Sequence, residues 1–511
     1  MRPGALIVGG VAFAVYVRTL MPGIAFGDWG EMQTVPHVLG VAHPTGYPTY
    51  ILLAWLAELV PIGSVAFRAN LLSAALVAAA LATVTVITER LGVRPLVAAA
   101  AALALGAVGT VWAAGTVAEV NPLHLLLVAL ILHRALVWEE GRRPRDLAIG
   151  GLLIGLAAGN HLLTVFVAPF VILFVLWAGR DELRARPALL LVAAGAVVLG
   201  LSVYLYIPIA AGAGPPLPYN NPTTLESVFW LVSGTQFRGS FDFLSSKGPG
   251  EFIASLPMLW DLVADRATPV VAVLGVAGLA LLVRRRPAFG LTVMAIGVVC
   301  IYIWANYLHL EHYLLVPWLV LALGVAVALE EIASLGERAV AGRGRATAVA
   351  VGGRATVAAG AAVGVLAVAG AVALAASTMA GADRSGDRSG EDYVAAVFAA
   401  LPANAVILSE WDTSTPLWHG QHVRGERPDV LIVDDTNIVY EGWVTREARI
   451  ASVVCQRPVF ILRLSDGDLA PTRQAYALTP FLSVPVAVGG PSAVIERQIY
   501  RVEPLPGTCS G

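Results

Sequence analysis

The sequence predicts an α-helical polytopic membrane protein with about eleven transmembrane helices, additional juxtamembrane helices and a small C-terminal α/β domain. Of its 511 residues 57% are hydrophobic and only 13% are charged, whereas soluble domains carry roughly 25% charged residues. Clusters of Arg recur between the long apolar segments. The net charge of -2 argues neither for nor against a nucleic-acid partner. No basic patch with interleaved aromatic residues is present, so none is expected.

Eleven segments are apolar enough to be spans, given that a crossing needs about 20 residues and somewhat fewer with snorkelling ends. They are residues 4–20, 68–88, 95–113, 120–138, 146–160, 162–178, 187–209, 267–283, 288–306, 313–333 and 355–378. The pair 146–160 and 162–178 is the open point, because these residues could also form one long tilted helix.

The apolar run 48–60 is too short to cross and is bounded by Pro48 and Pro61. If it is a juxtamembrane or re-entrant helix, every Arg cluster lies on the same side of the membrane. The positive-inside rule then places the N-terminus in the cytoplasm and the C-terminal region outside the cell. We therefore expect a multi-pass protein of the plasma membrane.

The composition changes after residue 380. Residues 381–390 form a polar linker that contains the repeat D-R-S-G-D-R-S-G, which separates a membrane domain at 1–380 from an extracytoplasmic α/β domain at 391–511. In the second domain, 391–402 is typical of an amphipathic helix, and 405–409, 429–433 and 458–462 are typical of buried strands.

Three cysteines occur in the chain. Cys455 and Cys509 both fall in the expected exported domain, where a disulfide between them could form. Cys300 lies in an apolar run and is expected to pack as a small hydrophobic residue. No Cys spacing typical of a metal site is present.

Residues 26–50 carry the most informative polar cluster. Asp28 and Glu31 are three residues apart, so a helical turn would place both on one face. No Lys or Arg occurs between Arg18 and Arg68 to neutralise them. In a half-buried pocket such carboxylates suit a general base, and both are our candidate catalytic residues. The plainer interpretation is a solvated acidic loop.

Further candidates lie on the same side of the membrane. The turn H-P-T-G-Y-P holds His43 and Tyr47 at the entry of the run 48–60. Cations that could bind an anionic phosphate are also expected there, although such residues can equally form an interfacial belt. The candidate substrate-binding residues are His43, Tyr47, Arg68, Glu119, His161, His309 and His312.

Residues 26–73, with F-G-D-W-G-E-M-Q, G-V-A-H-P-T-G-Y-P and F-R-A-N-L-L-S, resemble the signature of multi-pass proteins related to protein O-mannosyltransferases, in the GT-C class of membrane glycosyltransferases. The stretches A-E-V-N-P-L-H and G-L-A-A-G-N-H are similar to later motifs of that family. The resemblance implies a catalytic acid in the first external loop, which maps to Asp28. Thr45 stands where the family usually has a second proline.

The resemblance also implies a sugar donor carried on a polyprenyl phosphate. The first hypothesis is therefore an inverting glycosyltransferase that moves a sugar, with mannose as the candidate, to a hydroxyl of an extracytoplasmic protein or glycan. Membrane lipid is the other expected partner. No cofactor and no metal site are assigned, with a divalent metal as the alternative. The rival hypothesis is a polytopic transporter of a cation or sugar, although the ionisable residues fall at span ends instead of the midplane.

Overall fold

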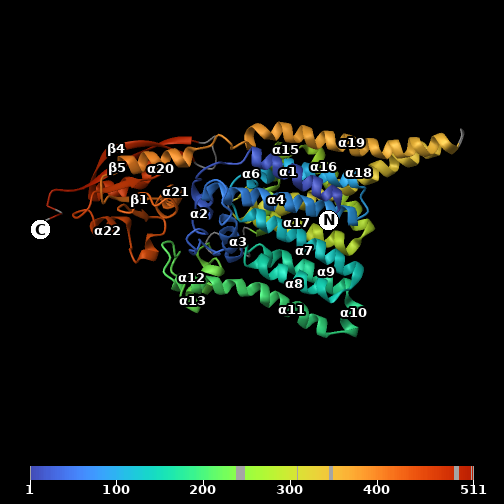
Figure 1. Cartoon of the computed structure of the whole chain (residues 1–511), viewed down its shortest axis with the longest axis horizontal. Helices are drawn as coiled ribbons and strands as arrows, with labels where there is room; N and C mark the ends of the chain where they lie inside the picture. The colour runs from blue at the N-terminus through green and yellow to red at the C-terminus, as the bar shows by residue number, and fades with distance from the viewer. Residues whose placement is uncertain are drawn as a thin grey trace.

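The computed structural model describes residues 2–237, 248–307, 309–343, 349–487, 494–507 and 509, with only the backbone for 342–343 and 349–357. A bundle of helices forms most of the molecule, and a small sheet domain lies at one end of its long axis (Figure 1). The short helices α2 (Gly27–Met32) and α3 (Pro48–Glu58) lie at the end of the bundle that faces the sheet domain (Figure 1).

The membrane part contains nineteen α-helices among the described residues. Besides α2 and α3 they are α1 (Pro3–Arg18), α4 (Val65–Arg90), α5 (Pro95–Ala107), α6 (Gly109–Ala114), α7 (Asn121–Gly141), α8 (Pro144–Ala158), α9 (Thr164–Ala178), α10 (Arg180–Ala185), α11 (Ala188–Leu201), α12 (Tyr206–Gly212), α13 (Leu225–Val232), α14 (Gly248–Ala254), α15 (Leu256–Arg266), α16 (Pro269–Arg285), α17 (Pro287–Asn306), α18 (Leu315–Arg343) and α19 (Val349–Ala382).

A helix or a pair of helices occupies each of the eleven segments expected to span the membrane. Six described helical segments are long and apolar enough to cross on their own, and a seventh is counted if the bent pair α15–α16 is one span. On α11, Leu191 is 75% and Val198 66% exposed, as expected of side chains that face lipid. The polytopic helical fold is confirmed, while the count of eleven crossings stays a prediction.

The structure defines the two segments, 48–60 and 146–178, for which the sequence left alternatives. The run 48–60 forms the 11-residue helix α3, which Pro48 starts at its first turn. The segment 146–178 is two helices, α8 and α9, separated by a turn at Gly159 to Leu163. Both observations agree with the arrangement that keeps the Arg clusters on one side.

The C-terminal part is a five-stranded sheet flanked by helices. Its strands have the order β2-β1-β3-β5-β4, with the first three parallel and β5 antiparallel to its neighbours. The elements are α20 (Ser389–Ala400), β1 (Val406–Ser409), α21 (Trp411–Trp418), β2 (Leu431–Asp434), α22 (Arg446–Ala451), β3 (Val459–Leu462), α23 (Ala470–Ala475), β4 (Tyr476–Ala487) and β5 (Val494–Pro504).

The strands β1, β2 and β3 overlap the three apolar runs seen in the sequence. All three are short, and most of their residues are buried. The hairpin of β4 and β5 was not predicted. Pro480 and Pro485 interrupt β4, and proline in a run usually argues against a central strand. Because β4 lies at the edge of the sheet, it tolerates both.

The two parts of the molecule share one hydrophobic cluster. Ile24 and Phe26, from the loop after α1, are buried together with Tyr393 and Val397 of α20. The rings of Phe26 and Tyr393 lie 5.2 Å apart. The backbone N–H of Arg384, in the linker, donates to the carbonyl of Thr19 at 3.0 Å. The sheet domain is thus fixed against the loop after α1.

Cys455 and Cys509 form a disulfide, which confirms the pairing considered from the sequence. Cys300 is free and buried in α17. We expect a thiol reagent to modify Cys300 alone in the denatured, non-reduced protein, and all three cysteines after reduction. Peptide mass spectrometry measures this directly. Labelling of three cysteines without reductant would contradict the bond.

Candidate active site

A cavity of about 510 Å³ lies between the helix bundle and the sheet domain. Both parts of the chain supply its walls. Titratable and polar residues on the walls include Asp28, His43, Tyr47, Glu119, Asn121, His161, Tyr219, Gln236, Tyr307, His312, Tyr313, Trp411, Thr436 and Asn437. The volume is within the range of small-molecule sites, about 300–1,000 Å³.

Asp28 lies in the first turn of α2 and is exposed to this cavity, with 53% of its side chain accessible. Its Oδ1 accepts a hydrogen bond of 2.7 Å from the indole Nε1 of Trp411. Its Oδ2 lies 4.0 Å from Nε2 of His43. Among the described residues no hydrogen bond to Oδ2 is found, so this oxygen is available to a substrate.

His43, Glu31 and Tyr47 form a hydrogen-bonded chain beside Asp28. Nδ1 of His43 donates to Glu31 through a short contact, and Glu31 Oε1 also accepts the backbone N–H of His43 at 2.8 Å. Tyr47 donates its hydroxyl proton to the carbonyl of Pro44 at 2.9 Å, so its oxygen accepts from Nε2 of His43 at 3.0 Å. This arrangement is the one that an imidazolium, with both ring nitrogens as donors, makes.

Electrostatics agree with this protonation state. Burial disfavours the charge on His43, but the carboxylates of Glu31 and Asp28 outweigh it and raise the pKa of His43 to about 9. Burial raises the pKa of Glu31, and the neighbouring imidazolium opposes that rise. This loop contains no Lys or Arg. Its positive charge is that of protonated His43, whose Nε2 lies 4.0 Å from Oδ2 of Asp28.

Two amides fix the loop that carries these groups. Gln33 Oε1 accepts the N–H of Ala25 at 2.8 Å, and its Nε2 donates to Asn70 Oδ1 at 2.8 Å. Asn70, on α4, also donates to the carbonyl of Met21 and accepts from the N–H of Ala118, each at 2.8 Å. Asn70 and Gln33 are both fully buried, so the loop, α4 and the segment before α7 hold a fixed geometry.

Glu119, His161 and His312 also reach the cavity, as their assignment to one side of the membrane predicts. Glu119 Oε2 accepts from the indole of Trp29 at 3.1 Å. The ring of His161 packs 5.6 Å from that of Tyr313, and burial lowers its pKa well below the usual range, so it is neutral. His312 stacks edge-on against the same tyrosine at 4.8 Å.

Three sequence assignments need correction. Arg68 does not line the cavity, because its guanidinium donates to the carbonyls of Glu58 at 2.5 Å and Val60 at 2.9 Å and so caps the end of α3. His309 bonds Ser255 at 3.0 Å and also lies outside the cavity wall. Glu31 is 1% exposed and reaches the cavity only through His43.

The sequence reading missed the residues that the sheet domain adds to the cavity wall, namely Trp411, Thr436 and Asn437. Trp411 follows β1, and the other two follow β2. The carboxyl ends of parallel strands are the usual binding edge of an α/β sheet. The polar residues directly after the predicted strands 405–409 and 429–433 were therefore the signal that could have found them.

Asp28, Glu31 and His43 offer three atoms that all lie within 4.8 Å of one another, as a metal site would require. A cation would need a neutral His43 with a free nitrogen lone pair. Both ring nitrogens are instead used as donors to Glu31 and Tyr47. These three groups could therefore hold a cation only if His43 gave up a ring proton.

The fold is the GT-C fold of membrane proteins such as ArnT. The structure of ArnT from Cupriavidus metallidurans bound to undecaprenyl phosphate superposes with a TM-score of 0.59 over 99% of both chains, at 12% identity. The apo form of the same protein gives 0.53 over 97% of both chains, at 14% identity. The GT-C-like fold expected from the sequence is confirmed.

The particular relatives are protein O-mannosyl-transferases. Residues 28–184 match the profile of the protein O-mannosyl-transferase TMEM260 N-terminal domain. Protein O-mannosyl-transferase TMEM260 of Mus musculus is 27% identical over 465 residues, covering 87% of this chain and 64% of the mouse protein. The Dictyostelium discoideum protein is 37% identical over 62 residues, 12% of this chain and 8% of its own. The resemblance that the sequence indicated is confirmed.

The His43–Glu31 pair predicts a pH dependence of stability. Because the folded protein raises the pKa of His43 from 6.5 to about 9, the pair stabilises fully below pH 6.5 and loses its effect as the pH rises through about 9. We expect the melting temperature in detergent to fall over that interval in the unmodified protein. Glu31→Gln removes the negative partner, so its curve should be flatter there. Parallel curves for the two proteins would contradict the pairing.

Proposed function

We propose that this chain is a membrane glycosyltransferase that moves a sugar from a polyprenyl-phosphate donor to an acceptor hydroxyl outside the cell, with inversion. The observation that carries the proposal is the position of Asp28 Oδ2, which faces a cavity of about 510 Å³ without a hydrogen-bond partner among the described residues. The GT-C fold and the similarity to protein O-mannosyl-transferases support the reaction class.

In the proposed reaction Asp28 Oδ2 takes the proton of the acceptor hydroxyl. The acceptor oxygen attacks the anomeric carbon, and the bond from that carbon to the phosphate oxygen breaks. The electron pair leaves with the lipid phosphate, whose negative charge needs a nearby positive group. His43 carries that charge, and His312 lies on the same cavity wall. Arg68 and His309, the other basic candidates from the sequence, lie outside the cavity wall.

The identity of the substrates rests on the relatives. ArnT is described with undecaprenyl phosphate bound, which supports a polyprenyl-phosphate carrier. The mouse relative is called a protein O-mannosyl-transferase, which favours mannose and a protein hydroxyl over a glycan hydroxyl. Because the chain covers 64% of that relative, both assignments are our proposals. We place the N-terminus in the cytoplasm and the cavity outside the plasma membrane.

The transporter hypothesis receives no support from the described residues. The candidate groups Asp28, His43 and Glu119 gather at one end of the bundle beside the sheet domain. Transport sites lie near the bilayer midplane, between repeated halves. A cavity closed on one side by a soluble domain fits a transferase better.

The first test replaces the base. Asp28→Asn keeps the size of the side chain but cannot accept a proton, so transfer of labelled mannose from a polyprenyl-phosphate donor should fall about 10²–10⁴-fold. The matched control is Glu226→Gln, an exposed carboxylate in the first turn of α13. Glu58, on α3, is unsuitable as a control, because it is 5% exposed and lies 3.4 Å from Nδ1 of His37. Near-normal transfer by a folded Asp28→Asn protein would exclude this role.

The second test concerns the cation. Since His43 provides a positive charge and its nitrogens are engaged, we propose that no divalent metal is needed. Transfer measured with EDTA should equal transfer without it. A loss that Mg²⁺ or Mn²⁺ restores would instead favour a metal held by the carboxylates.

A further inference from the structure

Trp411 connects the sheet domain to the proposed base. It is the first residue of α21 and comes directly after β1 and Glu410. Its indole N–H bonds Asp28 Oδ1 at 2.7 Å, across 383 residues of sequence. The edge of the same ring contacts His43 and Tyr219, with centroids 5.6 and 6.0 Å away. The indole is therefore held in one orientation by three groups of the membrane part.

The backbone at Trp411 is fixed from within the sheet domain. Its N–H donates to Thr436 Oγ1 at 3.0 Å, and Asp434 accepts the N–H of Thr436 at 3.1 Å. The turn after β2 thereby holds the start of α21. Asn437, in the same turn, donates to Asp434 at 2.7 Å and accepts from Tyr219 at 2.9 Å.

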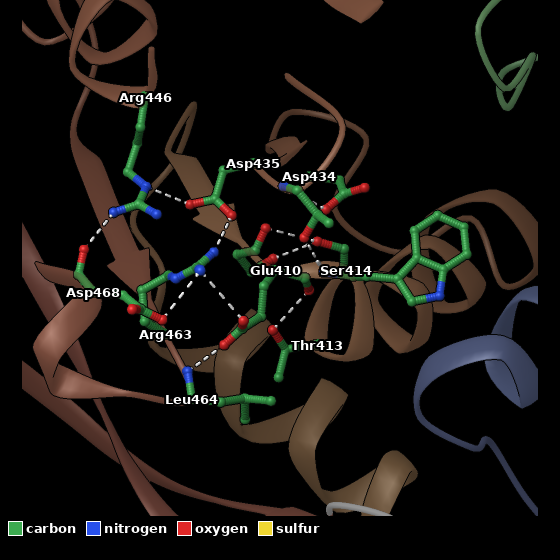
Figure 2. A network of polar contacts seen from close by, with 12 residues as sticks. Glu410, Thr413, Ser414, Asp434, Asp435, Arg446, Arg463, Leu464 and Asp468 are labelled. Carbon is green, nitrogen blue, oxygen red and sulfur yellow. Dashed lines mark hydrogen bonds and ion pairs between the residues drawn. The ribbon is translucent and has the colours of Figure 1, made fainter. Parts of the chain in front are cut away.

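An ion-pair network supports these two turns from behind (Figure 2). Asp435 lies between Arg446, at 2.5 Å, and Arg463, with a short contact. Glu410 pairs with Arg463 at 3.4 Å and accepts the N–H of Leu464. The side chain of Asp435 is fully buried, and breaking a buried network by removing one partner is costly. The ends of β1, β2 and β3 consequently form one rigid edge.

Close packing brings this edge against α2. A Cβ atom added at Gly27 would lie 2.5 Å from Oδ1 of Asp412, and one at Gly30 would lie 2.8 Å from Oγ1 of Thr415. Neither position has room for a side chain. Thr34, just after α2, contacts His419 at 3.2 Å. The separation between α21 and the helix that carries Asp28 is therefore fixed by side chains of α21 that touch the glycine backbone of α2.

We propose that Trp411 is a positioning residue of this active site: it holds Oδ1 of Asp28 so that Oδ2 points at the acceptor hydroxyl. The inference rests on the proposed function of Asp28 as the base. A carboxylate with both oxygens free would rotate and reach the productive geometry for only part of the time. The sheet domain is then part of the catalytic apparatus instead of an appended module.

The test compares two tryptophans whose rings meet edge to face, Trp411 and Trp418, with centroids 5.5 Å apart. Trp411→Phe keeps an aromatic ring but loses the N–H. We expect kcat for mannose transfer to fall about 10- to 100-fold, the range for loss of a hydrogen bond to a charged group, with KM for the lipid donor unchanged. Trp418→Phe, the control, should retain normal kcat. Normal kcat in Trp411→Phe would overturn the proposal.

A spectroscopic measurement makes the proposal independent of the assay. In protein labelled with 5-fluorotryptophan, the ¹⁹F resonance of Trp411 is assigned from its loss in Trp411→Phe. Asp28→Asn should shift this resonance and leave that of Trp177, at the far end of α9, in place. An unshifted Trp411 resonance would overturn the contact. If the unmodified protein transferred no sugar while the resonance shifted, the proposed function would fail and the contact would stand.

Discussion

The buried amide pair of Gln33 and Asn70 is the interaction on which the site depends. Asn70 ties the loop after α1 to α4 and to the segment before α7, and Gln33 ties the same loop to itself. Both side chains lie where water cannot replace a lost partner, so an unmade bond there would cost about 1–3 kcal/mol. The position of every group that faces the cavity from this loop therefore depends on this pair.

The site balances its charges within a short stretch of chain. A buried carboxylate is unfavourable by itself, and Glu31 is tolerated because His43 is protonated and bonded to it through both a ring nitrogen and the backbone. The imidazolium then serves a second purpose, since its other side faces Asp28 and the cavity. One residue thus compensates a structural charge and presents a positive charge to an anionic substrate.

Much of the fold could be predicted from the sequence, and less of the site. The lengths of the apolar segments and the positions of the Arg clusters located the helices. Both signals lie in local composition, because a span must be apolar over its whole length and basic residues gather on the cytoplasmic side. The spacing of Asp28 and Glu31 predicted a helical turn, but not that one carboxylate faces the cavity and the other the interior. Arg68 was misassigned because its partners are backbone carbonyls, which carry no sequence signal. Trp411 was missed because its contact joins residues 383 positions apart.

The hydrophobic cluster shared by Ile24, Phe26 and α20 has a consequence for how the chain is made. The core of the sheet domain is closed by two residues that are synthesised roughly 370 positions earlier. At about 5–20 residues per second, the loop after α1 is made about 20–70 s before the helix that covers it. The C-terminal segment expressed alone would lack these two residues of its core.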